Sequence, residues 1–314
     1  MFAGALDIGG TKTIVAIVNK DGSILSKRKI KTEIIDYKVH FLNCIKLLDE
    51  CLNEISIKRS DLIGLGINLP GMVNSSLGLL YNAPYAGWKD VKVTDFFHWN
   101  TKIKNIYIEN DVNSCALGEM YFGETSDNFL WITISTGIGG AIVVNKNLIK
   151  GSSFCAGEIG HMKVEYESPY KCSCGQYGCL EAHASGTALT RMFKELIQRD
   201  ADYRNKLTEF KLCPDASGMA YLAKHNDENC IEIFKLCGTY IGRALSNAIN
   251  LLNPKEIFLG GGVIDSYALI IGEINLQIRQ NTVKKCSEVN IKPTALGYEA
   301  ALLGSAALVF TNEN

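Results

Sequence analysis

Three cysteines and one histidine in the middle of the chain have the types and spacing of metal ligands. Cys172, Cys174 and Cys179 lie within eight residues, and His161 precedes them. Three thiolates and one imidazole are a common ligand set of tetrahedral structural zinc sites. Glycines inside the cysteine run would let the chain fold back on one ion, because glycine tolerates positive φ. We therefore predict a zinc site, the alternative being a chance cluster of reduced thiols beside a core histidine.

Two glutamates flank the predicted metal ligands. Glu158 lies three residues before His161, and Glu181 lies two residues after Cys179. A metal ion that fixed its ligands would also fix both carboxylates. The segment would then be a metal-held loop that presents two carboxylates to a ligand.

Two glycine-rich turns could hold phosphate groups. Gly9-Gly10-Thr11-Lys12 follows an expected strand at 2–8, and the run 135–140 follows another at 129–134. Backbone N–H groups exposed in such turns can bind phosphate oxygens, although most turns of this kind only reverse the chain. The pentapeptides 16–20 and 142–146 also resemble each other. If this repeat is real, two related domains each offer a glycine-rich hairpin to a nucleoside triphosphate.

Asp111 is the candidate proton acceptor. It follows Asn110 and an expected strand at 106–109, and it precedes a helical run at 112–122. Ligands of open α/β folds gather at this edge of the sheet. An isolated Asn-Asp pair is more simply explained by Asp111 as an N-cap. A carboxylate at a helix N-terminus also tends to stay ionised, as a proton acceptor near pH 7 must.

Hydrophobic periodicity and turn residues supply the elements that would position these side chains. A strand at 62–69 ends at Pro70-Gly71, and a strand at 255–259 runs into the glycines 260–262. The segment 78–88, rich in Gly, Pro and aromatic residues, is expected to be a loop. Further helices are expected at 38–57, 184–198, 229–252 and 299–310, the last apolar on one side.

Composition bounds the class of protein. The 314 residues are enough for about two domains, and 47% hydrophobic with 21% charged residues is typical of a globular protein. A net charge of -1 gives no general attraction to nucleic acid or to an anionic membrane, so neither is an expected partner. The eleven cysteines lack the paired spacing of a disulfide framework. With no signal peptide or membrane span, the expected location is the cytoplasm.

With these features the chain resembles the ROK family (repressors, open reading frames and sugar kinases) over essentially its whole length. The matching motifs are 7–12, 109–111, 135–140, 156–161, 172–181 and 260–262. The resemblance implies an α/β fold of the actin-like, hexokinase-like (ribonuclease H-like) two-domain ATPase type. The domains would be 1–115, with the terminal helix 299–314 packing back on it, and 116–298, with the zinc-binding loop.

The resemblance also implies roles for residues. Asp111 would be the catalytic base, and the zinc on His161, Cys172, Cys174 and Cys179 would be structural, with the second ring nitrogen of His161 facing the sugar. The sugar would be bound by Gly71, Asn110, Glu158, His161 and Glu181. ATP, with its Mg²⁺, would be bound by Asp7, Gly9, Gly10, Thr11, Lys12, Thr136, Gly137, Gly139, Gly140, Gly261 and Gly262.

These roles describe an ATP-dependent kinase for the 6-hydroxyl of a hexose, with glucose the first candidate on family frequency. The alternatives are an N-acetylmannosamine or N-acetylglucosamine kinase, a fructokinase, or an inactive sugar-binding regulator. A repressor with a DNA-binding module ahead of this domain is not expected, because Asp7 lies so near the start. Tyr85 stands where many sugar kinases of the family have asparagine, which leaves the sugar open. The family implies a homodimer or homotetramer.

Overall fold

The computed structural model describes residues 1–312 and consists of two compact units. The first unit comprises Met1–Asp127, Ala141–Ala156 and the chain from Thr294 onward; the second comprises Asn128–Gly140 and Gly157–Pro293. The predicted boundary at 115/116 falls inside helix α3 (Asp111–Phe122), which packs on the C-terminal helix α10 (Ala300–Thr311). Residues 313 and 314, included in the predicted terminal helix, lie outside the described residues.

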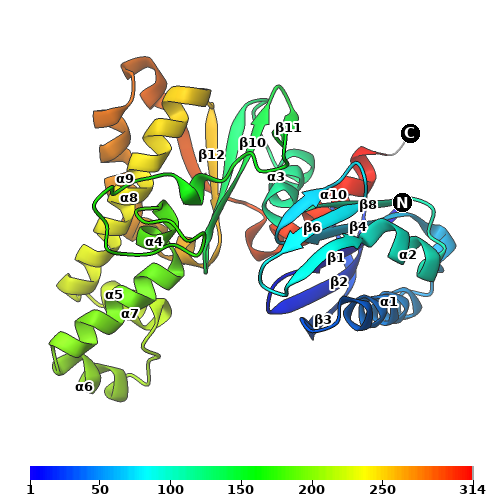
Figure 1. Ribbon diagram of the computed structural model, residues 1–314, viewed down its shortest axis with the longest axis horizontal. Helices are drawn as coiled ribbons and strands as arrows, with labels where there is room; N and C mark the ends of the chain where they lie inside the picture. The colour runs from blue at the N-terminus through cyan, green and yellow to red at the C-terminus, as the bar shows by residue number, and fades with distance from the viewer. Residues whose placement is uncertain (313–314) are drawn as a thin grey trace. The chain divides into compact units, whose positions relative to one another are not determined.

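A five-stranded sheet forms the centre of the first unit, in the order β3-β2-β1-β4-β8 (Figure 1). The strands are β1 (Phe2–Ile8), β2 (Lys12–Asn19), β3 (Ile24–Lys31), β4 (Leu62–Leu69) and β8 (Ile106–Asn110). β1, β2 and β3 form an antiparallel meander, whereas β4 is parallel to both β1 and β8. Because parallel strands end at one edge, the ends of β1, β4 and β8 come together.

Alternation along β1 explains how both faces of this sheet are buried. Leu6 and Ile8 belong to the core formed with helix α1 (Tyr37–Glu54). Ala3 and Ala5 belong to the core formed with α10 on the opposite face. Successive strand residues point to opposite faces, so the small alanines leave room for α10. Helix α2 (Val93–Thr101) contributes to the α1 side.

The second five-stranded sheet has the same topology, in the order β11-β10-β9-β12-β13. Its strands are β9 (Phe129–Ile134), β10 (Ile138–Val144), β11 (Asn147–Ile149), β12 (Glu256–Gly260) and β13 (Asn290–Pro293). The two orders are identical when each sheet is numbered from its own first strand. This identity is the relationship expected if the repeated pentapeptides, at the ends of β2 and β10, reflect two related domains.

The helices of the second unit follow the cysteine loop (172–179) along the sequence, although the strands β12 and β13 lie among them or after them. α8 packs along α9 at Gly238 and Gly242, where an added Cβ would meet the backbone and side chains of α9. The helices are α4 (Leu180–Ala184), α5 (Gly186–Arg199), α6 (Asp202–Glu209), α7 (Ala216–Lys224), α8 (Glu228–Leu252) and α9 (Tyr267–Asn281). Of the helices within residues 1–312, none is long and apolar enough to cross a membrane.

Several sequence-based expectations differ from the structure. The segment 78–88 is not a loop throughout: β6 (Leu79–Ala83) and β7 (Trp88–Lys92) pair with β5 (Met72–Asn74) in an antiparallel sheet. The expected helix at 184–198 begins instead at α5, because the Ser185 side chain caps that helix and separates it from α4. The terminal helix is buried on nearly all sides, not one, because it packs on both the sheet and α3.

Candidate functional site

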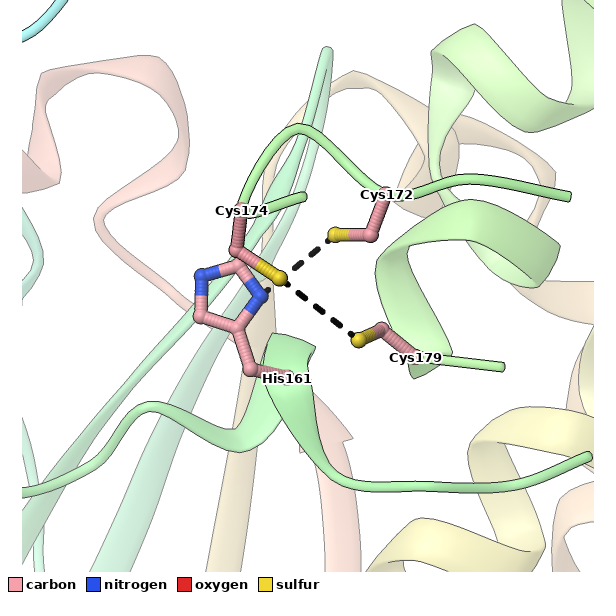
Figure 2. A group of neighbouring side chains, drawn as sticks. All are labelled: His161, Cys172, Cys174 and Cys179. Carbon is pink, nitrogen blue, oxygen red and sulfur yellow. Dashed lines mark hydrogen bonds between the residues drawn. The ribbon is translucent and has the colours of Figure 1, made fainter. Parts of the chain in front are cut away.

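The four predicted metal ligands lie together in the second unit. Figure 2 shows His161, from a short 3-10 helix at Ile159–His161, facing the three cysteines; all four ligand atoms are within 4.8 Å of one another. The Sγ atoms of Cys174 and Cys179 are 3.8 Å apart, and Cys172 Sγ is 3.5 Å from His161 Nδ1. Tetrahedral zinc separates two sulfurs by about 3.8 Å and a sulfur and nitrogen by about 3.6 Å, as its bond lengths require. The donor set therefore fits a zinc ion.

Two glycines make the tight cysteine loop possible. Gly175 and Gly178 adopt φ angles of 88° and 75°, which side chains strongly disfavour. An added Cβ at Gly178 would also collide with the carbonyl of Glu165. A hydrogen bond of 2.9 Å from Gly175 N–H to the carbonyl of Cys172 closes the turn. These contacts bring the sulfurs together through the backbone itself.

Lys163 is a neighbour of the cluster that sequence reasoning missed. Its Nζ donates to the carbonyl of Tyr177 at 2.5 Å and lies 3.4 Å from Cys179 Sγ. Three thiolates on one divalent ion leave a net negative charge, which a lysine at this distance would partly neutralise. Nothing in the local spacing marks Lys163, because its approach depends on the fold of the whole loop.

The imidazole of His161 divides its two nitrogens between the cysteines and a carboxylate. Nδ1 faces Cys172, whereas Nε2 lies 3.6 Å from Glu158 Oε2. The Glu158 side chain is 60% exposed, so this carboxylate is accessible to a ligand. A metal ion on Nδ1 would therefore orient Nε2 toward the exposed carboxylate.

Glu181 connects the cysteine loop to the glycine-rich hairpin. One of its carboxylate oxygens accepts hydrogen bonds from Ser173 Oγ at 2.6 Å and from Cys172 Sγ at 3.5 Å. The other accepts from the backbone N–H of Ile138 at 3.1 Å. Glu181 thus fixes a backbone amide inside the predicted phosphate-binding run.

Three of the predicted ATP-binding glycines of the second unit, Gly137, Gly139 and Gly140, belong to this hairpin. Gly137 packs on Glu181 and Gly140 packs on the carbonyl of Gly157. Thr136 accepts a hydrogen bond from Thr187 Oγ1 through its carbonyl, at 2.8 Å. In the late glycine run, Gly261 has a φ of 91° and packs on the backbone of Ile134 at the end of β9. Gly262 begins the short 3-10 helix that follows, and Gly139 lies within β10.

In the first unit, Asn110 and Asp111 begin helix α3. Asn110 is the N-cap: its Oδ1 accepts from the backbone N–H groups of Val112 and Asn113. Its Nδ2 donates to the carbonyl of Gly71 at 3.1 Å, so two predicted sugar-binding residues touch. Asp111 is therefore not the N-cap, as the simpler interpretation held, but the first residue of the helix.

Asp7 and Asp111 lie at the same edge of the sheet and affect each other. Asp7 is on β1 and Asp111 follows β8, at the ends of strands that both run parallel to β4. Burial and the negative charge of Asp111 raise the pKa of Asp7 to about 6, against the opposing influence of Asn68 and Lys12. A buried carboxylate whose pKa is raised by a second carboxylate nearby is typical of a functional site.

Glu109 and Lys150 support this edge and were not predicted as site residues. The buried Glu109 carboxylate lies 2.6 Å from Lys150 Nζ. Its other oxygen accepts from the backbone N–H of Asn110 and from the side chain of Asn113, at 3.0 and 3.1 Å. The available sequence signal was an acidic residue at the end of an apolar strand, which burial without a partner would penalise.

The first glycine-rich turn connects β1 to β2. Gly10, Thr11 and Lys12 are exposed, and Gly9 N–H donates to the carbonyl of Lys12 at 3.0 Å. Tyr85, the residue expected to alter the sugar pocket, packs its ring against Gly10. Burial and the charge of Asp111 raise the pKa of the Tyr85 hydroxyl. The first unit thus gathers Asp7, the turn, Gly71, Asn110 and Asp111 around the ends of three strands.

Comparison with known proteins gives three kinds of match. A model of the ROK family matches residues 3–312. A glucokinase of Halalkalibacterium halodurans is 32% identical over 98% of this chain and 95% of its own length. A xylose repressor of Bacillus spizizenii is 30% identical over 79% of this chain and 61% of its own length. A solved structure that is similar is the crystal structure of a ROK family glucokinase from Streptomyces griseus in complex with glucose and AMPPNP. Its sequence is 25% identical, and the match has a TM-score of 0.83 and covers 99% of this chain and the whole of that glucokinase chain.

Proposed function

Since the chain belongs to the ROK family and has the family's actin-like, hexokinase-like α/β fold, we propose that it is an ATP-dependent sugar kinase. The proposed reaction transfers the γ-phosphoryl group of ATP to the 6-hydroxyl of a hexose, with glucose as the first candidate. The glucokinase relative, of nearly the same length, supports a kinase of this type.

The observation that carries the proposal is the place of Asp111. Its carboxylate begins α3 at the sheet edge where β1, β4 and β8 end, close enough to Asp7 for the two charges to interact. In the proposed step, Asp111 accepts the proton of the 6-hydroxyl while that oxygen forms a bond to the γ-phosphorus. The bond from phosphorus to the β–γ bridging oxygen breaks, and ADP leaves. General-base assistance contributes roughly 10²–10⁴ in rate.

The remaining roles are mostly positioning, as is usual in phosphoryl transfer. Asn110 is well placed to bind a sugar hydroxyl because its contacts with α3 and Gly71 fix its orientation. We assign the phosphates to the turns at 9–12 and 136–140 and the adenosine end to Gly261 and Gly262. Mg²⁺ would enter with the nucleotide and neutralise phosphate charge.

The proposed zinc ion has a structural role. Two of its donor pairs, Cys172 with His161 and Cys174 with Cys179, already have the separations of a tetrahedral site, and all four donors lie within 4.8 Å of one another. When bound, the ion would hold the loop through its ligands and leave Nε2 of His161 to bind a sugar hydroxyl together with Glu158. Glu181 would act at the same sugar from the other end of the loop.

Two groups of alternatives keep the same fold and loops. N-acetylmannosamine, N-acetylglucosamine or fructose could replace glucose, because the proposed base and phosphate loops are indifferent to the sugar. An inactive sugar-binding regulator is the second alternative, favoured by the similarity to a xylose repressor. The pair of Asp7 and Asp111 supports a kinase instead, since sugar binding alone does not require it. A homodimer or homotetramer in the cytoplasm remains our expectation.

A substrate screen tests the proposal. The purified chain would be assayed with Mg-ATP and a dozen hexoses and amino sugars, with ADP release coupled to a spectroscopic readout. We expect turnover with at least one hexose. If no sugar is phosphorylated although calorimetry detects sugar binding, the protein is a regulator and the kinase proposal is wrong.

A further inference from the structure

A chain of buried polar side chains connects helix α1 to the glycine-rich turn at 9–12. His40 Nε2 lies 2.8 Å from Thr13 Oγ1, which lies 3.0 Å from Thr32 Oγ1. Thr32 Oγ1 donates to the carbonyl of Gly9 at 2.7 Å. His40 and Thr13 are fully buried and Thr32 is 4% exposed, so water cannot replace these bonds. Neither the zinc loop nor the proposed base uses these three side chains.

The direction of every hydrogen bond in this chain is determined. The backbone N–H of Glu33 donates to His40 Nδ1 at 3.2 Å, so Nδ1 is the acceptor and the ring proton is on Nε2. Nε2–H therefore donates to Thr13. The Thr32 hydroxyl has one proton and donates it to the carbonyl of Gly9, so the Thr13 hydroxyl must donate to Thr32. Each group in the series therefore donates to the next, from the N–H of Glu33 through His40, Thr13 and Thr32 to the carbonyl of Gly9.

The arrangement requires a neutral imidazole. A proton on Nδ1 would face the N–H of Glu33 and break the sequence at its first bond. Desolvation lowers the pKa of His40, against the opposing charge of Glu33, so the ring is neutral near pH 7. The Trp88 and Phe41 rings, with centroids 6.0 and 6.4 Å from that of His40, hold it in place.

Thr32 also holds the turn through its backbone. Its N–H donates to the carbonyl of Thr11 at 3.0 Å, while its hydroxyl holds Gly9. Two carbonyls of the turn are therefore directed inward onto one residue. When a carbonyl points inward, the N–H of the same peptide unit points the opposite way, because the peptide group is planar and trans. The amides of Gly10 and Lys12 are the ones so directed.

We propose that His40 is a positioning residue for the nucleotide: through Thr13 and Thr32 it fixes the outward direction of the amides that bind phosphate. The inference rests on the proposed function, because it takes the turn at 9–12 to hold the phosphates of ATP. It adds a residue that is not among the predicted ligand contacts and that reaches Gly9 only through Thr13 and Thr32. The competing explanation is a buried polar cluster that only stabilises the packing of α1 on the sheet.

The test compares Thr32→Val and His40→Phe with a matched control, Thr101→Val. Thr101 is also buried, at 3% exposure, and its hydroxyl donates to the carbonyl of Phe97 at 2.7 Å, away from the turn. We expect Thr32→Val and His40→Phe each to raise the KM for ATP about three- to tenfold, which is the effect of one lost hydrogen bond. The KM for the sugar should stay within about twofold of the wild-type value. Thr101→Val should leave both KM values unchanged, whatever its effect on the thermal midpoint.

The double variant separates a connected chain from independent effects. If His40 acts through Thr32, adding His40→Phe to Thr32→Val raises the KM for ATP no further. Multiplied effects, or an unchanged KM for ATP in both folded single variants, would overturn the proposal. His40→Gln, which can still donate to Thr13, should recover part of the loss and provides a second variant if His40→Phe does not fold.

Hydrogen–deuterium exchange distinguishes failure of this inference from failure of the kinase proposal. Amides of a peptide covering 8–13 should exchange faster in Thr32→Val and His40→Phe than in the wild type, and at the wild-type rate in Thr101→Val. This readout needs no turnover. If the wild-type protein had no kinase activity, only the proposed function would be refuted. If exchange at 8–13 were unchanged in both Thr32→Val and His40→Phe, the positioning role would be refuted.

Discussion

Glu181 accepts a hydrogen bond of 3.1 Å from the backbone N–H of Ile138, which joins the cysteine loop to the glycine-rich hairpin. The other proposed sugar-binding carboxylate of this unit, Glu158, is exposed and lies 3.6 Å from His161 Nε2. The two glutamates therefore differ in what they hold besides a sugar. Glu181 fixes part of the proposed phosphate site, whereas Glu158 faces the imidazole and solvent.

This difference predicts separate kinetic effects. Glu158→Ala should raise the KM for the sugar about tenfold or more, the usual loss for a hydrogen bond to a charged group, and leave the KM for ATP unchanged. Glu181→Ala should raise both, because Ile138 loses its acceptor as well. Steady-state kinetics with each substrate varied in turn would measure both constants. Equal effects of the two variants on the KM for ATP would contradict a link through Glu181.

Asp111→Asn should abolish most turnover without preventing sugar binding. The amide keeps the size of the side chain and its place at the start of α3 but cannot accept a proton, so kcat should fall by roughly 10²–10⁴. Calorimetry should still detect the sugar. The matched control is Asp36→Asn, since Asp36 caps α1 by accepting from Lys38 N–H and asparagine caps equally well. Substantial residual activity in Asp111→Asn would remove it from the role of base.

Removal of the metal should affect the sugar site. Elemental analysis should find about one zinc per chain, because a structural site holds one closed tetrahedral ion. Cys172→Ser should lose the zinc, lower the thermal midpoint and weaken sugar binding, since the His161 imidazole would no longer be fixed. Cys213→Ser, at an exposed cysteine outside the cluster, is the control. Metal-free protein that bound sugar with unchanged affinity would separate the cysteine cluster from sugar recognition.

Local patterns predicted the parts of the structure that depend on neighbouring residues in sequence. The strands at 62–69 and 129–134 have the predicted bounds, because each is a mostly apolar run ended by a turn. The metal donors also come together as predicted, since two glycines impose the turn within the same short segment. In contrast, the hairpin of β6 and β7 was missed, because the turn residues around Pro84 obscured the buried positions Leu80 and Trp88.

Long-range polar contacts were beyond sequence reasoning. Thr13 lies in β2 and Thr32 directly follows β3, and threonine is common in and beside strands. His40 lies on the buried face of an amphipathic helix. Their connection to Gly9 appears only when α1 packs on the sheet. The same holds for Glu109, whose partner Lys150 comes from a segment much later in the chain. The residue that caps α3 was also ambiguous, because Asn110 and Asp111 are both good N-caps.

Asp7→Asn should stabilise the protein at neutral pH while it impairs catalysis. The pKa of Asp7 is raised from 3.8 to about 6, so the folded state holds the proton more tightly than the unfolded state. The favourable contribution of the protonated form, complete below pH 3.8, is therefore lost as the pH rises to about 6. Asparagine cannot ionise and avoids this loss. The gain in unfolding free energy should be near zero at pH 4 and about 1–2 kcal/mol at pH 7.5.

Urea unfolding without nucleotide or divalent cation, at several pH values, would measure this difference. Asp21→Asn is the opposite control: hydrogen bonds from Ser23 lower the pKa of this exposed carboxylate, so its removal should not stabilise the protein at neutral pH. If Asp7→Asn were destabilising at pH 7.5, the hydrogen bonds of the Asp7 carboxylate would outweigh its burial and its repulsion by Asp111. A stabilised but impaired Asp7→Asn variant would instead indicate that the ionised pair is retained for function at the expense of stability.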